Sequence, residues 1–269
     1  MARNKKRPLL PFILIFTLLL FVMIFAIVFG LIQTDEPKPQ IETVAEPRAN
    51  EYHADAFYYN NGFMRYSDSA HMVGIDVSVH QGVIDWHRVK SAGVEFAIIR
   101  LGYRGSSEGG IYEDERFHYN LQNAKDLGIQ VGLYFFSQAI STEEALEEAE
   151  FVLSTLANRS LDLPIYFDWE YLQGRIDTAT DINLTEFALT FCERIESAGY
   201  KAGVYFNQSF GYTKLDLLKL ESYHLWLAEY NETPSFRYHF DCLQYSDNGT
   251  IDGIHEPVDL NLLFINKAE

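Results

Sequence analysis

The sequence predicts an α/β fold: an irregular β/α barrel of about eight strands, preceded by one transmembrane helix. Three observations support this prediction. Residues 9–32 form an apolar run without a charge, short β-type runs alternate with helical stretches from Met72 onward, and acidic residues stand at the ends of several of those runs. With 269 residues, 48% of them hydrophobic, the chain is long enough to bury one barrel-sized core.

The apolar run is predicted to be an uncleaved signal anchor. At about 1.5 Å of rise per residue it extends about 36 Å, which is enough to cross a bilayer with some tilt. Signal-peptide apolar regions reach only about 15 residues, and no good cleavage site follows this one promptly. Four positive residues precede it: Arg3, Lys5, Lys6 and Arg7. The positive-inside rule therefore places residues 1–8 in the cytoplasm and the large domain outside, in a cell-membrane protein with a single span.

A tether is predicted to follow, over residues 33–71. Pro37, Pro39 and Pro47 lie there among charged residues, and a stretch rich in Tyr and Asn comes next. This composition is expected of a linker rather than a packed element. The folded domain is accordingly predicted to cover residues 72–269.

Charge and cysteine content exclude some classes of partner. The net charge is -17, and without the four positive residues at the amino terminus the rest of the chain carries -21. Such an acidic domain repels nucleic acid, so no nucleic-acid partner is predicted. Cys192 and Cys242 are far apart and form no metal-ligand motif, so no metal or cofactor is predicted. Two separate buried thiols are favoured over a disulfide.

The barrel strands are predicted from runs of apolar, β-branched or aromatic residues. They cover Val73–Val77, Phe96–Leu101, Gln130–Ser137, Leu163–Trp169, Ala202–Asn207, Tyr223–Ala228, Phe240–Tyr245 and Val258–Phe264. Helices are predicted between the earlier strands, over Trp86–Ala92, Asp114–Leu127, Thr142–Ala157 and Leu184–Ala198. After about Leu220 the strands follow too closely for full crossover helices, so the last three are expected to pair antiparallel or through short loops.

Acidic residues at strand ends are the candidate catalytic groups. Side chains alternate along a strand, so Asp168 and Glu170 point to the same face. Asp76 ends the first predicted strand and Asp259 begins the last, so all four carboxyls can meet at one mouth of the barrel. Crowded carboxyls raise one another's pKa, which supplies the acid and the ionised partner that glycoside hydrolysis needs. The alternative for any single acid is a loop cap or an ion pair with Arg100.

Several blocks of sequence together resemble glycoside hydrolase family 25, the Chalaropsis-type lysozymes. The blocks are Gly74–Gly82 with Ile84–Trp86, Phe96–Arg100, Val131–Ser137, Leu163–Glu170, Phe191–Tyr200, Gly203–Tyr205, Leu225–Tyr230, Gln244–Ser246 and Val258–Asn261. The resemblance implies a flattened β/α barrel that cleaves the β-1,4 bond between N-acetylmuramic acid and N-acetylglucosamine in peptidoglycan. It places the family's acids on Asp76, Asp168, Glu170 and Asp259, with Glu170 as the general acid. Leu243 departs from the Trp found in many members, which would alter one aromatic wall of the cleft.

Sugar-binding residues are expected on strand faces that point inward or toward the mouth. The candidates are Tyr134, Tyr166, Tyr205, Trp226, Tyr230 and Gln244. The expected partners are peptidoglycan glycan strands and, through the apolar helix, the membrane, and the domain is expected to be monomeric. Two alternatives stay open: a chitinase or N-acetylglucosaminidase, although position 166 is Tyr where those enzymes carry Asp, and an inactive, membrane-tethered glycan-binding protein.

Overall fold

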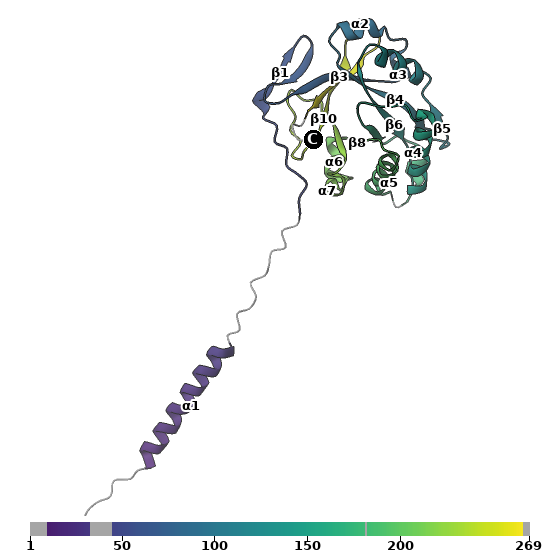
Figure 1. Ribbon diagram of the computed structural model, residues 1–269. Coiled ribbons are helices and arrows are strands. Elements are labelled where there is room, and N and C mark those ends of the chain that lie inside the picture. The colour runs from purple at the N-terminus through teal and green to yellow at the C-terminus, as the bar shows by residue number, and fades with distance from the viewer. Residues whose placement is uncertain (1–9, 33–44, 181, 266–269) are drawn as a thin grey trace, which may run out of the picture. The chain divides into compact units, whose positions relative to one another are not determined.

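The computed structural model describes residues 10–32, 45–180 and 182–265 (Figure 1). The chain forms two compact units, and the boundary between them in the sequence falls between Ala45 and Glu46. The first unit contains helix α1, Leu10–Ile32, whose apolar window Ile13–Gly30 has a mean hydropathy of 3.1 and no buried residue. This helix is long and apolar enough to cross a membrane, a property that signal sequences share. The predicted cytoplasmic tail, and the tether over residues 33–44, lie outside the described residues.

The second unit is the predicted barrel. Its strands are β3 (His71–Val77), β4 (Phe96–Arg104), β6 (Gln130–Ser137), β7 (Ile165–Trp169), β8 (Ala202–Asn207), β9 (His224–Ala228), β10 (Cys242–Gly249) and β11 (Val258–Phe264). They pair in the order β3-β11-β10-β9-β8-β7-β6-β4, and β4 pairs with β3 to close the ring. A short strand, β5 (Ile111–Glu113), adds to the outside of β4. All eight barrel strands predicted from the sequence are therefore confirmed.

Helices cover the first half of the barrel and become scarce in the second. The helices are α2 (Trp86–Ser91), α3 (Phe117–Asp126), α4 (Thr142–Leu156), α5 (Leu184–Ser197), α6 (Gln208–Thr213) and α7 (Leu217–Leu220). Short 3-10 turns occur at Ala54–Ala56, Val79–Gln81 and Arg175–Thr178. The connection from β9 to β10 contains no helix, yet these strands pair parallel, whereas β11 runs antiparallel to both β10 and β3. The predicted irregularity of the second half is confirmed.

Each strand separates an interior cluster from an outer layer, as the alternation of side chains requires. On β7, Tyr166 belongs to the interior cluster, while Ile165 and Phe167 belong to the outer layer beneath the helices. Full burial of such apolar side chains stabilises the fold by about 1.5–3 kcal/mol each. The interior cluster fills one end of the barrel, and the strand ends at the other end are left for polar groups.

Residues 46–71 correct the predicted tether, because they pack onto the barrel as part of the second unit. Strands β1 (Phe57–Asn60) and β2 (Phe63–Tyr66) form a hairpin that contacts β3 and β11 (Figure 1). Phe63 and Met64 are buried, and the ring of Tyr52 stacks on that of Phe264 at 3.9 Å between centroids. The hairpin thus covers part of the outer side of β3 and β11. The many Tyr and Asn residues made this stretch look like a linker, although its apolar side chains are buried against the barrel.

The two cysteines lie in different layers. Cys192 on α5 belongs to the outer layer and Cys242 on β10 to the interior cluster, and both are free and buried. The expectation of two separate thiols is confirmed.

Candidate active site

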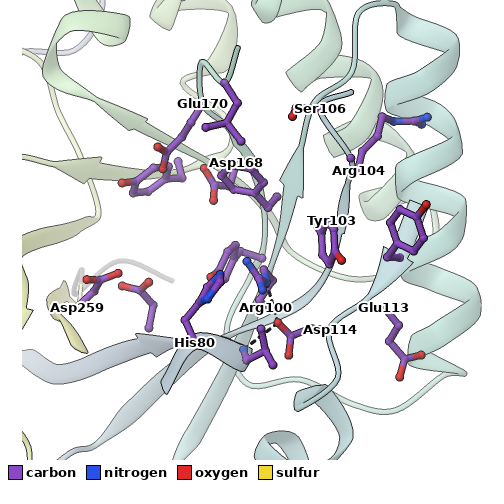
Figure 2. Close-up of a pocket in the computed structure, with 18 of the residues that line it drawn as sticks. His80, Arg100, Tyr103, Arg104, Ser106, Glu113, Asp114, Asp168, Glu170 and Asp259 are labelled. Atoms are coloured by element: carbon purple, nitrogen blue, oxygen red, sulfur yellow. Dashed lines mark hydrogen bonds and ion pairs between the residues drawn. The ribbon is translucent and has the colours of Figure 1, made fainter. Parts of the chain in front are cut away.

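Four carboxyl groups meet at the open end of the barrel, where they line a cleft of about 860 Å³ (Figure 2). Asp76 lies near the end of β3, Asp168 near the end of β7, and Glu170 just after β7. Asp259 lies at the start of β11, which runs antiparallel, and it pairs directly with Asp76 across the two strands. The strand ends thus bring together all four acids that the sequence singled out.

Asp76 is held by two side-chain amides. Gln244 Nε2 donates to Asp76 Oδ2 at 2.8 Å, and Asn261 Nδ2 donates to the same oxygen at 2.7 Å. All three side chains are buried. Burial raises the pKa of Asp76, and the bonds from Asn261 and Gln244 act in the opposite direction by stabilising its ionised form.

Asp259 is the other member of this carboxyl pair. Burial is the largest cause, and the negative charge of Asp76 the next, of a pKa for Asp259 that is raised to about 9. Its carboxyl is hydrogen-bonded to that of Asp76.

Asp168 and Glu170 form the second pair. Burial, followed by the negative charge of Glu170, raises the pKa of Asp168 well above its usual value. Burial also raises the pKa of Glu170, with a further contribution from Asp259. Asp168 Oδ1 is buried and accepts no hydrogen bond from any described residue. An acceptor left in this state at the base of a cleft is suited to an N–H or O–H group of a ligand.

The cations in the cleft wall are already paired with other acids. Arg100 Nε donates to Asp114 Oδ2 at 2.8 Å, and Asp114 also accepts from the backbone amides of Val79 and Arg116. The ion pair with Arg100 that was the alternative for the acids at strand ends is therefore made by Asp114. Arg100 acts on Asp168 only through its nearby charge, which lowers the pKa of that carboxyl and partly offsets its burial.

Five of the six predicted sugar-binding residues line the cleft: Tyr134, Tyr205, Trp226, Tyr230 and Gln244. Gln244 is not free to face a ligand, because its Oε1 accepts hydrogen bonds from the hydroxyls of Tyr205 at 2.9 Å and Tyr230 at 2.8 Å. Tyr166 does not line the cleft. It is 1% exposed within the barrel, and its hydroxyl is 2.9 Å from His224 Nδ1. Leu243 points into the outer layer, so its departure from the family pattern leaves the cleft wall unchanged.

Tyr103 and Asn261 were missed from the sequence. Arg100 and Tyr103 both line the cleft although three positions separate them, because the pairing of β4 with β6 shifts by one residue between Arg100 and Gly102. Regular alternation gives no hint of such a shift. Asn261, by contrast, stands two residues after Asp259 on the same strand, a spacing that the sequence did offer.

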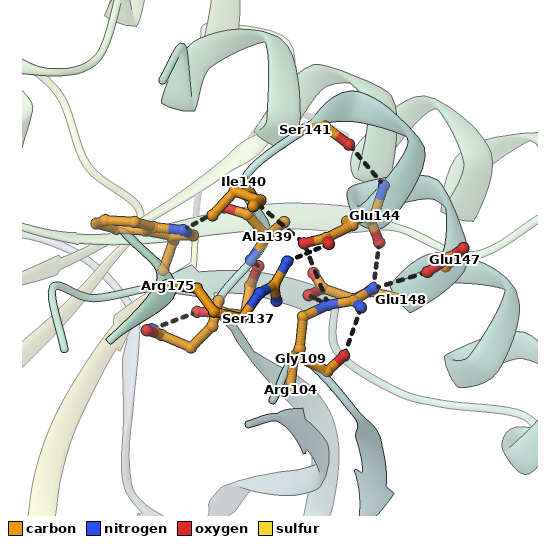
Figure 3. A network of polar contacts seen from close by, with 12 residues as sticks. Arg104, Gly109, Ser137, Ala139, Ile140, Ser141, Glu144, Glu147, Glu148 and Arg175 are labelled. Atoms are coloured by element: carbon orange, nitrogen blue, oxygen red, sulfur yellow. Dashed lines mark hydrogen bonds and ion pairs between the residues drawn. The ribbon is translucent and has the colours of Figure 1, made fainter. Parts of the chain in front are cut away.

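The outer wall of the cleft is held by a set of charges that we call the Arg104 cluster, in which Arg104 and Glu148 are buried: Arg104, Glu144, Glu147, Glu148 and Arg175 (Figure 3). Arg104 Nε donates to Glu148 at 2.7 Å, and Arg104 Nη1 donates to the carbonyl of Gly109 at 2.8 Å. Arg175 pairs with Glu144 through its side chain, and its backbone amide donates to the carbonyl of Ser106 at 2.8 Å. The segment that follows Glu170 is thereby fixed against the loop between β4 and β5.

Close packing of these two segments depends on glycine. A Cβ atom at Gly174, where φ is +152°, would lie 2.4 Å from the carbonyl oxygen of Ser106.

Among the described residues, no group of three or more His, Cys, Asp or Glu side chains is arranged to hold a metal ion.

Comparisons with known proteins agree with this geometry. The family model "Glycosyl hydrolases family 25" matches residues 75–254. The autolytic lysozyme of Clostridium acetobutylicum is 29% identical over 191 residues, which cover 71% of this chain and 55% of that protein. This chain therefore spans about half the length of that relative.

Solved structures with the same fold include the bacterial lysozyme of Streptomyces coelicolor, with 27% identity, a TM-score of 0.60, and coverage of 75% of this chain and 95% of that one. The modular autolysin LytC of Streptococcus pneumoniae, solved with a synthetic peptidoglycan ligand, has 22% identity and a TM-score of 0.65, with coverage of 78% and 52%. The family model covers most of the barrel and the strand ends that hold three of the four acids. This chain belongs to glycosyl hydrolases family 25.

Proposed function

We propose that this protein is a membrane-anchored peptidoglycan hydrolase that cleaves the β-1,4 bond between N-acetylmuramic acid and N-acetylglucosamine. Membership of a glycosyl hydrolase family supports the reaction class, and the autolysin that was solved with a peptidoglycan ligand supports the substrate. The observation that carries the proposal is the unpartnered Oδ1 of Asp168 beside Glu170 in a cleft with raised carboxyl pKa values.

Glu170 is the general acid in this mechanism. Its raised pKa favours the protonated carboxyl, which can donate a proton to the glycosidic oxygen as the bond breaks. The Gln138 side chain donates to the Glu170 carbonyl at 2.7 Å and fixes the backbone from which this carboxyl projects.

Asp168 assists a nucleophile that belongs to the substrate. The 2-acetamido carbonyl oxygen attacks the anomeric carbon while the glycosidic C–O bond breaks, and its N–H donates to Asp168 Oδ1. Positive charge that develops on the acetamido group is stabilised by this carboxylate, whose affinity for a proton is high because it is buried. Water then attacks the anomeric carbon, gives its proton to Glu170, and releases a reducing-end sugar with retained configuration.

Asp76 and Asp259 supply a single negative charge beneath the sugar and do not attack it. Tyr134, Tyr205, Trp226 and Tyr230 provide aromatic faces and hydroxyls along the glycan. Helix α1 anchors the protein, with the positive residues of the amino terminus in the cytoplasm and the barrel outside. This orientation gives the barrel access to nearby wall.

The bond that is cleaved can be identified from the new sugar ends. The full-length chain in detergent is incubated with peptidoglycan, and the products are reduced with borohydride and hydrolysed to free sugars. New muramitol is expected. New glucosaminitol would instead identify an N-acetylglucosaminidase, and the absence of both would indicate a glycan-binding protein. Protease treatment of intact spheroplasts tests the orientation, because only an external barrel is degraded.

The role of Asp168 is tested with the variant Asp168→Asn. A loss of hydrolysis is expected together with weaker inhibition by a thiazoline analogue of the cyclised acetamido intermediate. Unchanged inhibition by this analogue would show that Asp168 does not contact the acetamido group. Glu143→Gln, a change of an exposed acid at the start of α4, is the control and should leave both properties unaltered.

A further inference from the structure

Two amides and one carboxylate form a connected set at the base of the cleft. Gln244 on β10 and Asn261 on β11 are direct partners across these two strands, and both donate to one oxygen of Asp76 on the neighbouring β3. Asp259 is two residues before Asn261 on β11 and is the direct partner of Asp76 on β3. The four side chains therefore belong to three adjacent antiparallel strands.

The orientation of the Asn261 amide is fixed from behind by Trp226. The indole Nε1 donates to Asn261 Oδ1 at 2.8 Å, and an indole N–H has no acceptor function. The amide oxygen must face Trp226, so the amide nitrogen must face Asp76. Asp76 Oδ2 is consequently required to act as an acceptor.

Gln244 has the same arrangement on the other side of Asp76. Its oxygen accepts from the hydroxyls of Tyr205 and Tyr230, which leaves its nitrogen to donate to Asp76. Gln244 is 3% exposed and Asn261 is fully buried, so water does not compete for either amide. One carboxylate oxygen thus receives two buried N–H donors, and the direction of the Asn261 donor is fixed by Trp226.

We propose that Asn261 and Gln244 are positioning residues that keep Asp76 ionised and thereby place the proton of the Asp76–Asp259 pair on Asp259. Two donors aimed at one oxygen favour the carboxylate over the acid at that position. The remaining proton then belongs to Asp259, which donates it to Asp76. The raised pKa of Asp259 agrees with this placement. The pair carries one negative charge in one fixed location.

The location of this negative charge affects Asp168 and Glu170, the two groups that act on the glycosidic bond. The negative charge of Asp76 contributes to the raised pKa of Asp168, and Asp76 and Glu170 also interact through their charges. The titratable groups that face the pair are Tyr134 on β6, Asp168 and Glu170 at β7, Tyr205 on β8, Tyr230 after β9, and Cys242 and Asp247 on β10. Among the groups that shift the pKa of Asp76 or Asp259, those that carry charge are acidic. Protonation of Asp76 is opposed by its hydrogen bonds, of which those from Asn261 and Gln244 are the largest and that from Asp259 the next.

The kinetic test uses two isosteric variants, Asn261→Asp and Gln244→Glu. Each retains the oxygen that accepts from Trp226 or from the tyrosines, and each loses the N–H that donates to Asp76. The pair should then gain its second proton at a pH higher by about one to two units, because a bond to the charged form is lost. The acid limb of the kcat/KM profile is expected to move up by this amount in both variants.

The chain offers a matched control in Asn120→Asp. Asn120 is also fully buried and accepts from an indole, that of Trp86 at 3.2 Å, but no described residue accepts a hydrogen bond from its amide nitrogen. The same substitution in a second buried Trp–Asn pair should lower stability without moving the pH profile. If the profiles of Asn261→Asp and Gln244→Glu coincide with that of Asn120→Asp, the two amides do not position the proton.

The kinetic test of this inference rests on the proposed function, because it needs peptidoglycan hydrolysis. A direct measurement of the two carboxyl groups does not. The full-length chain in detergent micelles, labelled with ¹³C at the aspartate carboxyls, is titrated by NMR, with Asp76→Asn and Asp259→Asn used for assignment. An ionised Asp76 beside a protonated Asp259 at neutral pH is expected. The reverse would overturn the inference even if peptidoglycan is cleaved, and the expected spectrum would support it even if peptidoglycan is not.

Discussion

The cleft and the Arg104 cluster both bury carboxyl groups, but they differ in whether a cation contacts them. In the Arg104 cluster, Arg104 Nε is 2.7 Å from Glu148, and Arg175 pairs with Glu144. In the cleft, Arg100 pairs with Asp114, and its charge only partly offsets the burial of Asp168. Burial raises the pKa of Glu148 to about 7 in spite of its contact with Arg104. The two places therefore differ in what the acids contact: those of the cluster hold two segments together, while those of the cleft face a space that a ligand can enter. Buried carboxyl groups that contact an arginine have a structural role here, and those that do not are available for chemistry.

The largest difference should appear when one acid is neutralised at each place. Glu170→Gln is expected to lower peptidoglycan hydrolysis by about 10²–10⁴-fold, because the general acid is lost. Stability at neutral pH should stay equal or rise, since a buried carboxyl with a raised pKa is removed. Turbidity loss of wall suspensions and thermal unfolding measure the two effects. Hydrolysis at the original rate would remove Glu170 from its assigned role.

Breaking the Arg104 cluster should have the opposite signature. Arg104→Met leaves Glu148 buried without its cation, and a loss of about 3–5 kcal/mol in the free energy of unfolding is expected. The double variant Arg104→Met with Glu148→Leu should recover part of this loss. Arg88→Met, which breaks an exposed pair with Asp252, is the control and should cost less than about 1 kcal/mol. Equal losses in the two single variants, measured by chemical denaturation, would contradict the distinction.

The next largest effect should be a change in how stability depends on pH when Asp259 is neutralised. The pKa of Asp259 is about 9 in the folded state, above its value in the unfolded chain, so folding favours the protonated form. Its contribution to stability is complete below about pH 4 and is lost as pH rises toward 9. Asp259→Asn should make the melting temperature fall less between pH 5 and 9. An unchanged slope would show that Asp259 is ionised in the folded protein.

The smallest expected effect concerns tyrosines inside the barrel. Tyr166→Phe removes a hydroxyl that meets His224 away from the cleft, so a loss of about 1 kcal/mol in stability and less than a twofold change in hydrolysis are expected. Tyr205→Phe removes a bond to Gln244, and its hydrolysis should fall further than that of Tyr166→Phe. Steady-state rates of both variants on the same peptidoglycan decide this, and a larger loss in Tyr166→Phe would place that residue in the site.

The sequence alone determined the elements whose signal is local. All eight barrel strands were found, because apolar runs with alternating faces and helical spacing are properties of neighbouring residues. The same alternation predicted that Asp168 and Glu170 share a face, and strand ends brought Asp76 and Asp259 into the group. The resemblance to a known family added the roles of these residues.

Only the tertiary structure decided which polar residues act on the site and which are structural. Tyr166 and Tyr205 both occupy inward positions, but their depth along the barrel separates core from cleft. Residues 46–71 have the composition of a linker, yet they belong to the barrel unit, because β2 contacts β3 and β11. The pairing of Arg100 with Asp114, and of Asn261 with Asp76, depends on distances between strands that no local pattern encodes. Composition supplied the charges, and the closure of the barrel decided which of them meet.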